Sequence, residues 1–494
     1  MLRTLIGGVV IVVGAALACF AAAATPATAI VIQDHTALLA APRDSAQHQA
    51  VLWQGEVVEV RGERMDYVQV YDYKRERGGF VRASQIRRTT LSASEAPDLL
   101  SVVRFLRDTP GAEALGIGFA AAYIQAVPAE VLNSEAGIDA LDALGTFADR
   151  LARRASSGSQ QSKAAQTALS AHVDGARAYG IKFTNHERNG RMQICYEGDA
   201  FRRVLAMRSN PEQRARAALA LTRQECVNPD LHPLERKRVD EWRADVLERV
   251  DTSALAGYVK NRVQMRRAAV WSSLAYHRAR NGEAADVAAN RSLTAFAAIN
   301  KTELAEDDTR VYNDAAMRVG ASRWAAVPAA AAKARNIILV TAPGQPGETC
   351  IALVDTKREG GNPLARRCTY GIVWASSATL NREDTALAVA VQPLDTWREL
   401  WIFRKARDGW TVHVLPPATT NPDVGYAEFA GWVPGGTQML VAREAKGEGK
   451  YKRSFELVRI DSFSTSRQAS DPSALTAFQR WQDPSWKRLT LSIR

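Results

Sequence analysis

The stretch Leu52–Ile86 reads LWQGEVVEVRGERMDYVQVYDYKRERGGFVRASQI and decides the fold of the N-terminal part of the chain. Polar and apolar residues alternate in Glu56–Val60 and again in Tyr67–Tyr71, which is the period of a half-buried β-strand. Polar turns separate these runs, and the pair Gly78-Gly79 suits the positive φ of a tight hairpin. Short strands at this spacing predict a small β-barrel or sandwich.

The same residues resemble the bacterial SH3 (SH3b) domain. Gln54-Gly55 precedes a β-branched strand, Tyr67 begins the next strand, and Gly79-Phe80-Val81 comes near the end, as in that family. Phe80 stands where a Trp is common, and the usual Asn-Val-Arg after the first strand is absent. Over residues 30–92 the resemblance implies a small SH3-like β-barrel that binds a ligand, often a cell-wall peptide. The aromatic residues that could line its groove are Tyr67, Tyr71, Tyr73 and Phe80. Alternatively, Phe80 and either Tyr67 or Tyr71 fill the barrel interior.

The first residues have the pattern of a secretory signal peptide. Arg3 precedes the apolar run Leu5–Phe20, and Ala27-Thr28-Ala29 forms a small-x-small cleavage site. We therefore expect residues 1–29 to be a signal peptide and the protein to be periplasmic or secreted. The apolar run has 16 residues, fewer than the span of about 20 that crosses a bilayer comfortably. We expect no stable membrane span after cleavage, although retention as an anchor stays an alternative.

The cysteines agree with export. Cys19 lies in the predicted signal peptide, and four cysteines remain, Cys195, Cys226, Cys350 and Cys368. Four cysteines allow three pairings, and the local pairs Cys195–Cys226 and Cys350–Cys368 are the simplest. Their spacing does not have the close Cys-x-x-Cys pattern of a zinc site, so we expect disulfides and no metal or other cofactor.

Residues 93–333 predict an all-α middle domain, either a bundle or a solenoid. Ala- and Leu-rich segments at helical spacing recur between breakers such as Asn210-Pro211 and Asn281-Gly282. The segment 235–250 pairs opposite charges four residues apart, including Arg236 with Asp240, which indicates a solvated helix. Residues 184–191 are polar and predict a loop or a hairpin before Cys195.

Residues 334–494 predict a C-terminal all-β domain with a weak repeat of roughly 50 residues. Gly431-Trp432-Val433-Pro434-Gly435-Gly436, followed by Met439-Leu440-Val441, resembles a β-propeller blade of the TolB or WD40-like kind, although Gly435 replaces the usual Asp. About three such units fit, whereas a closed propeller usually needs four or more. A partial propeller and a β-sandwich are both open, and the whole chain is predicted to be a multidomain α+β protein.

The chain carries a net charge of +11, which attracts polyanions at low salt but does not by itself make a nucleic-acid binder, and we expect no nucleic-acid partner. No zinc His-Glu-x-x-His motif, nucleophile elbow or P-loop is present. We therefore expect an exported, non-enzymatic interaction or scaffold protein of the bacterial cell envelope that binds peptidoglycan or an envelope protein. The alternative is a cell-envelope hydrolase, or a hydrolase inhibitor, whose site sequence patterns do not reveal.

Overall fold

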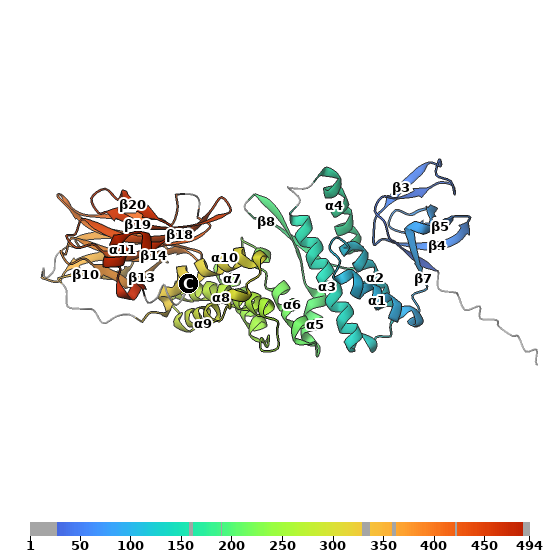
Figure 1. Cartoon of the computed structure of the whole chain (residues 1–494), viewed down its shortest axis with the longest axis horizontal. Helices are drawn as coiled ribbons and strands as arrows, with labels where there is room; N and C mark the ends of the chain where they lie inside the picture. Colours follow the sequence, from blue (N-terminus) through green and yellow to red (C-terminus); the bar gives the residue numbers. More distant parts are fainter. Residues whose placement is uncertain are drawn as a thin grey trace, which may run out of the picture. The chain divides into compact units, whose positions relative to one another are not determined.

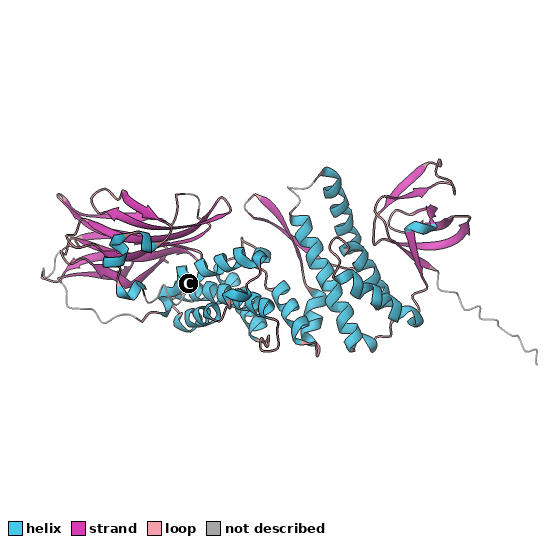
Figure 2. Cartoon of the chain, in the orientation of Figure 1, coloured by secondary structure: helices cyan, strands magenta, loops and turns pink. Residues whose placement is uncertain are grey.

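The computed structural model describes residues 27–157, 162–188, 190–328, 336–357, 362–419 and 422–487 (Figure 1). Most of the predicted signal peptide therefore lies outside the described residues. The chain divides into two compact units, Met1–Ile181 and Lys182–Arg494. The division falls inside the helical region 93–333, so that each unit combines helices with sheet, as Figure 2 shows.

The first unit begins with a seven-stranded antiparallel sheet in the order β3-β2-β6-β5-β4-β1-β7. Its strands are β1 (Thr28–Val31), β2 (Thr36–Leu39), β3 (His48–Leu52), β4 (Val57–Arg64), β5 (Tyr67–Asp72), β6 (Arg77–Arg82) and β7 (Ile86–Thr89). Nine buried aliphatic side chains from these strands form one core, which includes Val58, Val68, Val70 and Val81. The small β domain expected from the sequence is therefore present in outline.

The sheet does not close into a barrel, because β3 and β7 are its two edges and do not pair with each other in the described residues. The expected closed barrel is wrong in this respect. The first strand, β1, also begins before the predicted end of the signal peptide. Thr28 and Ala29 pair with β4 and β7, and Ala29 is fully buried. The predicted cleavage after Ala29 therefore falls inside a strand of this sheet.

Four helices complete the first unit, α1 (Ala96–Arg107), α2 (Glu113–Ala126), α3 (Glu135–Ser156) and α4 (Lys163–Ala178). Gly55 lies where the sheet contacts these helices. Its φ is +88°, and an added Cβ would overlap the backbone carbonyl of Ala114 in α2. The Tyr179 hydroxyl donates to the Gly55 carbonyl oxygen, and His172 Nε2 lies 2.7 Å from Asp34 Oδ1. The N-terminal sheet is therefore packed directly against the helices that follow it.

The second unit starts with the hairpin β8 (Phe183–Arg188) and β9 (Arg191–Tyr196), which confirms a hairpin before Cys195. Its helices are α5 (Asp199–Ala206), α6 (Pro211–Leu221), α7 (Pro233–Glu248), α8 (Gly257–Arg280), α9 (Asp286–Ala297) and α10 (Thr309–Ser322). Asn210 caps α6 and Gln213 completes the capping box, as the Asn-Pro start of that helix suggests. Trp271 and Leu274 of α8 lie in the core that these helices share.

The solvated face predicted for residues 235–250 is wrong at Asp240. That side chain in α7 has no exposed surface, and Arg243 beside it is 1% exposed. Asp240 accepts from Arg243 at 2.5 Å, from Arg236 at 3.1 Å and from the Ser273 hydroxyl at 2.7 Å. The four-residue spacing of Arg236 and Asp240 is typical of a surface ion pair. Here, however, the Asp240 carboxylate is buried between two arginines.

The C-terminal strands form three successive antiparallel meanders. They comprise β10 (Ile337–Pro343), β11 (Thr349–Asp355) and β12 (Ala365–Thr369); β13 (Ile372–Leu380), β14 (Ala386–Leu394), β15 (Trp397–Ala406) and β16 (Gly409–Leu415); and β17 (Val424–Trp432), β18 (Gln438–Gly447), β19 (Lys450–Arg459) and β20 (Thr465–Ala469). A short parallel contact between β15 and β17 links the second and third meanders. The helix α11 (Thr476–Trp481) follows.

The second meander is buried on both faces, which explains the uninterrupted apolar run of β14. Leu387 and Val389 share a core with Ile351 and Leu353 of the first meander. Ala386 and Ala388 face a second core that contains side chains of the third meander. The described strands thus stack face to face without forming a ring, an arrangement that leaves the choice between partial propeller and sandwich open.

Within the described residues, no helix has the length and apolar character needed to cross a bilayer. The described helices and strands form a mixed chain with an N-terminal sheet, a helical middle and C-terminal sheets. This arrangement confirms the α+β class.

Candidate functional site

The aromatic residues predicted to bind a ligand lie in the first unit on the face of β5 and β6 that is turned away from the main core. Tyr67 and Phe80 pack with Leu39 and Ala46 in a small separate cluster. Phe80 does not enter the main core, because the neighbouring Val81 points there. Phe80 therefore packs in this smaller cluster and not in the main core of the sheet.

Tyr71 and Tyr73 form a second pair on the same sheet. Their rings meet edge to face with centroids 4.9 Å apart, and the Arg61 guanidinium lies 3.9 Å above the Tyr71 ring. Tyr73 is 67% exposed, and its hydroxyl donates to Glu59. This hydrogen bond raises the pKa of Tyr73. The predicted set is thus split into two pairs, of which only Tyr73 is exposed while Tyr71 is half-buried, and its role in binding stays a prediction.

A second candidate site lies in the second unit, where sequence patterns predicted none. A groove of about 370 Å³ opens between α10 and the strands β17–β19. Its residues come from five elements, and six of the ten are aromatic or cationic. They are Lys301, Tyr312, Asn313, Ala316, Met317, Tyr426, Glu444, Tyr451, Lys452 and Arg453.

Strand register brings the groove's polar residues together. Tyr426 pairs with Glu444, and Glu444 pairs with Arg453 on the next strand, so these side chains share one face of the sheet. Met317 of α10 packs on Tyr426 and Tyr451 to form an apolar floor. The floor is rigid because its residues belong to a helix and a paired sheet.

Positive charge dominates the rim of the groove. Lys301, Lys452 and Arg453 are exposed cations, whereas Glu444 is the single carboxylate in the lining. Glu444 accepts from the Tyr426 hydroxyl at 2.9 Å and lies 3.9 Å from Arg453. Its charge is therefore already engaged within the site, and the rim presents net positive charge to a ligand.

The Tyr451 hydroxyl of the groove is a neutral donor. Burial raises the pKa of Tyr451, whose hydroxyl donates to the Arg310 carbonyl oxygen at 3.1 Å. Lys301 lies 5.7 Å from the Tyr312 ring centroid, in cation–π contact. The groove can hold an apolar or planar group on its floor and anionic groups at its rim.

An open, more polar hollow of about 1040 Å³ lies along the same β18–β19 ribbon. It shares Tyr451, Lys452 and Arg453 with the groove, and its own lining includes the ion pair Arg443–Glu456 at 3.2 Å. The β18–β19 ribbon therefore contributes Lys452 and Arg453 to both the groove and the hollow.

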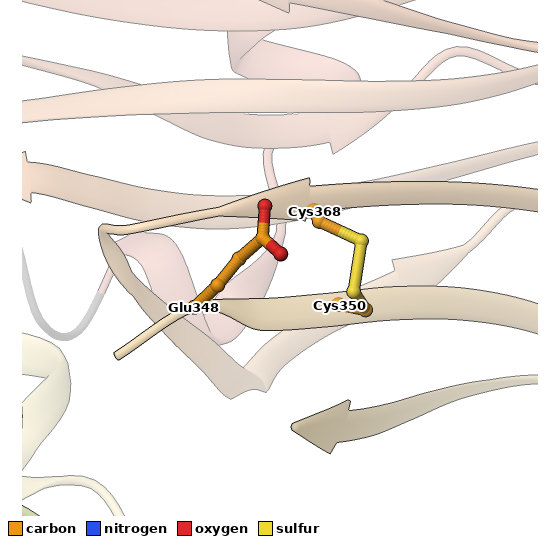
Figure 3. A group of neighbouring side chains, drawn as sticks. All are labelled: Glu348, Cys350 and Cys368. Carbon is orange, nitrogen blue, oxygen red and sulfur yellow. A yellow bond between two sulfur atoms is a disulfide. The ribbon is translucent and has the colours of Figure 1, made fainter. Parts of the chain in front are cut away.

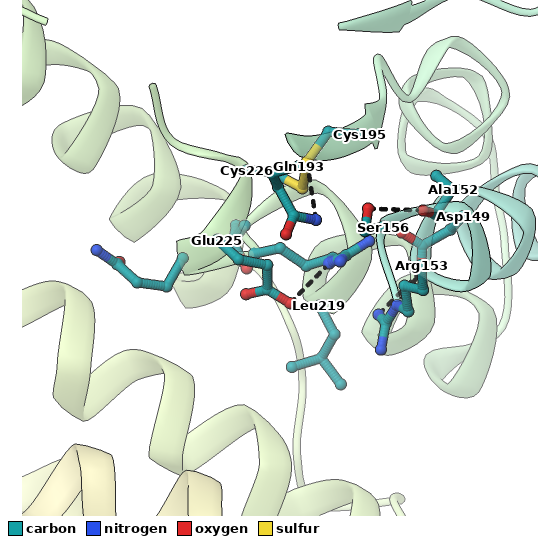
Figure 4. A network of polar contacts seen from close by, with 12 residues as sticks. Asp149, Ala152, Arg153, Ser156, Gln193, Cys195, Leu219, Glu225 and Cys226 are labelled. Atoms are coloured by element: carbon teal, nitrogen blue, oxygen red, sulfur yellow. Dashed lines mark hydrogen bonds and ion pairs between the residues drawn. A yellow bond between two sulfur atoms is a disulfide. The ribbon is translucent and has the colours of Figure 1, made fainter. Parts of the chain in front are cut away.

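The cysteines pair as the sequence predicted, Cys195 with Cys226 and Cys350 with Cys368. Figure 4 shows the first bridge beside Gln193, whose amide nitrogen lies 3.9 Å from Cys195 Sγ. Figure 3 shows the second bridge beside Glu348. Among the described residues, Glu348, Cys350 and Cys368 are the one group with metal-ligand geometry. Both sulfur atoms are bonded to each other, so this group offers only a carboxylate.

Sequence reasoning missed the groove because its residues are spread from Lys301 to Arg453. One local signal was available in the basic turn KGEGKYKR at 446–453, which supplies Tyr451, Lys452 and Arg453. Without the fold, nothing in that turn indicates that α10 covers it.

The comparisons with known proteins assign the chain to no protein family. Neither a protein-family model, nor a curated protein, nor a solved structure matches the chain. A function for this chain must therefore be inferred from the chemistry of the aromatic face and of the groove.

Proposed function

We propose that the protein is an exported interaction protein of the bacterial cell envelope and that the groove beside α10 binds a carboxylate-bearing peptide. The observation that carries the proposal is the combination of a tyrosine-lined floor with three exposed cations at the rim. Ligand sites typically join an apolar surface to a few polar groups that fix orientation. Two disulfides in a chain of this size support an oxidising compartment.

The carboxylates can come from two sources, the stem peptides of the cell wall or an acidic segment of an envelope protein. Both would place anionic groups near Lys301, Lys452 and Arg453 and side chains on the floor. The +11 net charge of the chain would draw either ligand in from a distance at low salt.

Binding can be tested on the full chain with two probes, fluorescein-labelled octaglutamate in anisotropy and purified peptidoglycan sacculi in co-sedimentation. We expect octaglutamate to bind at low salt and oligoglutamine of the same length not to bind. Sacculi that bind as well would assign the carboxylates to the wall, whereas octaglutamate alone would point to an acidic protein segment.

The triple variant Lys301→Ala, Lys452→Ala, Arg453→Ala should weaken octaglutamate binding about 10- to 100-fold, because each exposed charge contact contributes about 0.5–1 kcal/mol. A matched triple variant removes the exposed cations Lys260, Lys405 and Arg407, which lie outside the groove lining. If both triple variants lose affinity equally, general charge and not the groove binds the probe, and the proposal fails.

The aromatic face of the first unit provides the competing explanation for wall binding. The variant Tyr71→Ala, Tyr73→Ala leaves the groove unchanged. Sacculus binding that depends on these tyrosines and not on the groove cations would place the site on the SH3-like sheet instead.

A further inference from the structure

The disulfide Cys350–Cys368 has an environment that differs from that of the other bridge. Cys350 of β11 and Cys368 of β12 are directly opposite each other in the ladder, as Figure 3 shows. Cys350 is 2% exposed, whereas Cys368 is half-buried. The two cysteines therefore differ in exposure.

They also differ in charge. Arg366 Nη2 lies 3.3 Å from Cys350 Sγ, a position in which its positive charge stabilises a thiolate on that sulfur. A leaving thiol of lower pKa leaves faster in thiol–disulfide exchange. Because Cys368 is the more exposed cysteine and Cys350 carries the stabilised leaving sulfur, both features favour the same direction of attack.

We propose that Cys350–Cys368 is an exchangeable disulfide that accepts two electrons from a dithiol, a property that does not depend on ligand binding in the groove. A thiolate of the dithiol attacks Cys368 Sγ, the S–S bond breaks, and Cys350 leaves as a thiolate beside Arg366. The second thiol of the reductant, after losing its proton, attacks the mixed disulfide and releases the Cys368 thiolate. The reductant ends as a disulfide, and both cysteine thiolates can then take up protons.

The fold allows this cycle without unfolding. β11 and β12 stay joined by five consecutive paired positions, from Thr349↔Thr369 to Leu353↔Ala365. Ile351 and Leu353 of β11 are fully buried in the core shared with the second meander. Reduction removes a covalent link between strands that hydrogen bonds and packing already hold together.

The bridge Cys195–Cys226 has a similar difference in exposure, since Cys195 is 2% exposed and Cys226 is half-buried, but it differs in its strand contacts and in the charge beside it. It joins β9 to the short 3-10 turn Gln224–Cys226, and no strand ladder connects the two segments. The group near Cys195 Sγ is the neutral amide of Gln193 at 3.9 Å. This bridge adds to the contacts of His186 Nε2 with the Glu225 carbonyl oxygen at 2.9 Å and of Arg188 with the Gln224 carbonyl oxygen at 3.1 Å, and we assign it a structural role.

The Glu348 carboxylate opposes the formation of a thiolate at this bridge. Its carboxylate lies within 4.8 Å of both sulfur atoms and disfavours a second negative charge there. Arg366 is therefore the group whose charge the exchange step needs, which makes it the residue to replace.

The test uses the oxidised full chain and dithiothreitol as the dithiol. Samples are quenched in acid at set times, free thiols are alkylated with N-ethylmaleimide, and each cysteine is followed by peptide mass spectrometry. We expect Cys350 and Cys368 to be alkylated before Cys195 and Cys226, with unchanged circular dichroism.

Arg366→Gln should slow the opening of Cys350–Cys368 about threefold for each unit by which the pKa of the leaving Cys350 thiol rises, and Arg366→Lys should keep most of the rate. The control Arg367→Gln removes the neighbouring guanidinium, which lies over Trp401 and pairs across from the buried Ile351. Equal opening rates for the two bridges, an unchanged rate in Arg366→Gln, or opening only together with loss of the circular dichroism signal would each overturn the proposal.

Discussion

Replacing Asp240 by asparagine removes one negative charge from a position with no exposed surface. Arg243 would lose the partner at 2.5 Å that balances its own buried charge, although it would still donate twice to the Thr222 carbonyl oxygen. Ser273 keeps an acceptor in the asparagine side-chain oxygen. The variant therefore isolates the charge and leaves the shape of the site nearly unchanged.

The size of the effect follows from burial. Removing one partner of a buried ion pair costs about 3–5 kcal/mol, because the remaining charge cannot be solvated. The same helix supplies the matched control, since Asp245 and Arg249 form an ion pair in which both side chains are more than half exposed. Asp245→Asn should cost at most about 0.5 kcal/mol.

Urea unfolding of the two variants, followed by circular dichroism and tryptophan fluorescence, measures the difference. At an m value of about 3 kcal/mol/M, Asp240→Asn should lower the transition midpoint by about 1–1.7 M and Asp245→Asn by less than about 0.2 M. If the two substitutions shift the midpoint equally, the Asp240 carboxylate does not hold the buried arginine, and the buried ion pair described for α7 is wrong.

The pH dependence gives a second check. Burial raises the pKa of Asp240, but the charges of Arg243 and Arg236 and the Ser273 hydroxyl outweigh it, so the pKa is lowered. A carboxylate with a lowered folded-state pKa contributes stability that is present above its unfolded pKa of 3.8 and is lost as pH falls below that value. The stability gap between wild type and Asp240→Asn should therefore shrink as pH falls below about 4.

Two further substitutions test the packing of the N-terminal sheet on its helices. Gly55→Ala should destabilise the first unit by about 2 kcal/mol or more, because the added methyl group meets the Ala114 carbonyl at a positive φ. Thermal unfolding checks this, and Gly175→Ala, which meets nothing within 4 Å in α4, should leave the unit equally or more stable. For Asp34, burial raises the pKa, but hydrogen bonds from His172 and the Gln54 backbone lower it further than burial raises it. Asp34→Asn should lower the melting temperature at pH 6, with the difference from wild type shrinking below pH 3.8, and a gap that is constant with pH would contradict an ionised Asp34.

The sequence was informative wherever a signal is local. Alternation in Tyr67–Tyr71 predicted β5, Asn210-Pro211 predicted the start of α6, and the spacing of the cysteines predicted both disulfides. In each case the residues that decide the structure are neighbours, or they belong to one region of the chain. Turn chemistry and strand period act over a few residues, so no knowledge of the fold is needed to read them.

What escaped prediction depends on which surfaces meet. The i,i+4 pair Arg236–Asp240 has the same spacing as Asp245–Arg249, yet one is buried and the other is exposed. The difference comes from Ser273 and Thr222, which other segments place beside α7. A helical charge pattern fixes which residues share a face of a helix but not what that face contacts.

The groove shows the same principle at a larger scale. Lys301 and Tyr312 are separated from Tyr451 by more than a hundred residues, and they meet only because α10 packs on β17. Two of its three cations come from the basic turn at 446–453, whereas its floor requires Met317 to cover Tyr426. A binding site of this kind is a property of the contact between a helix and a sheet, and for that reason the search for a ligand should begin at the groove rather than at the most recognisable part of the sequence.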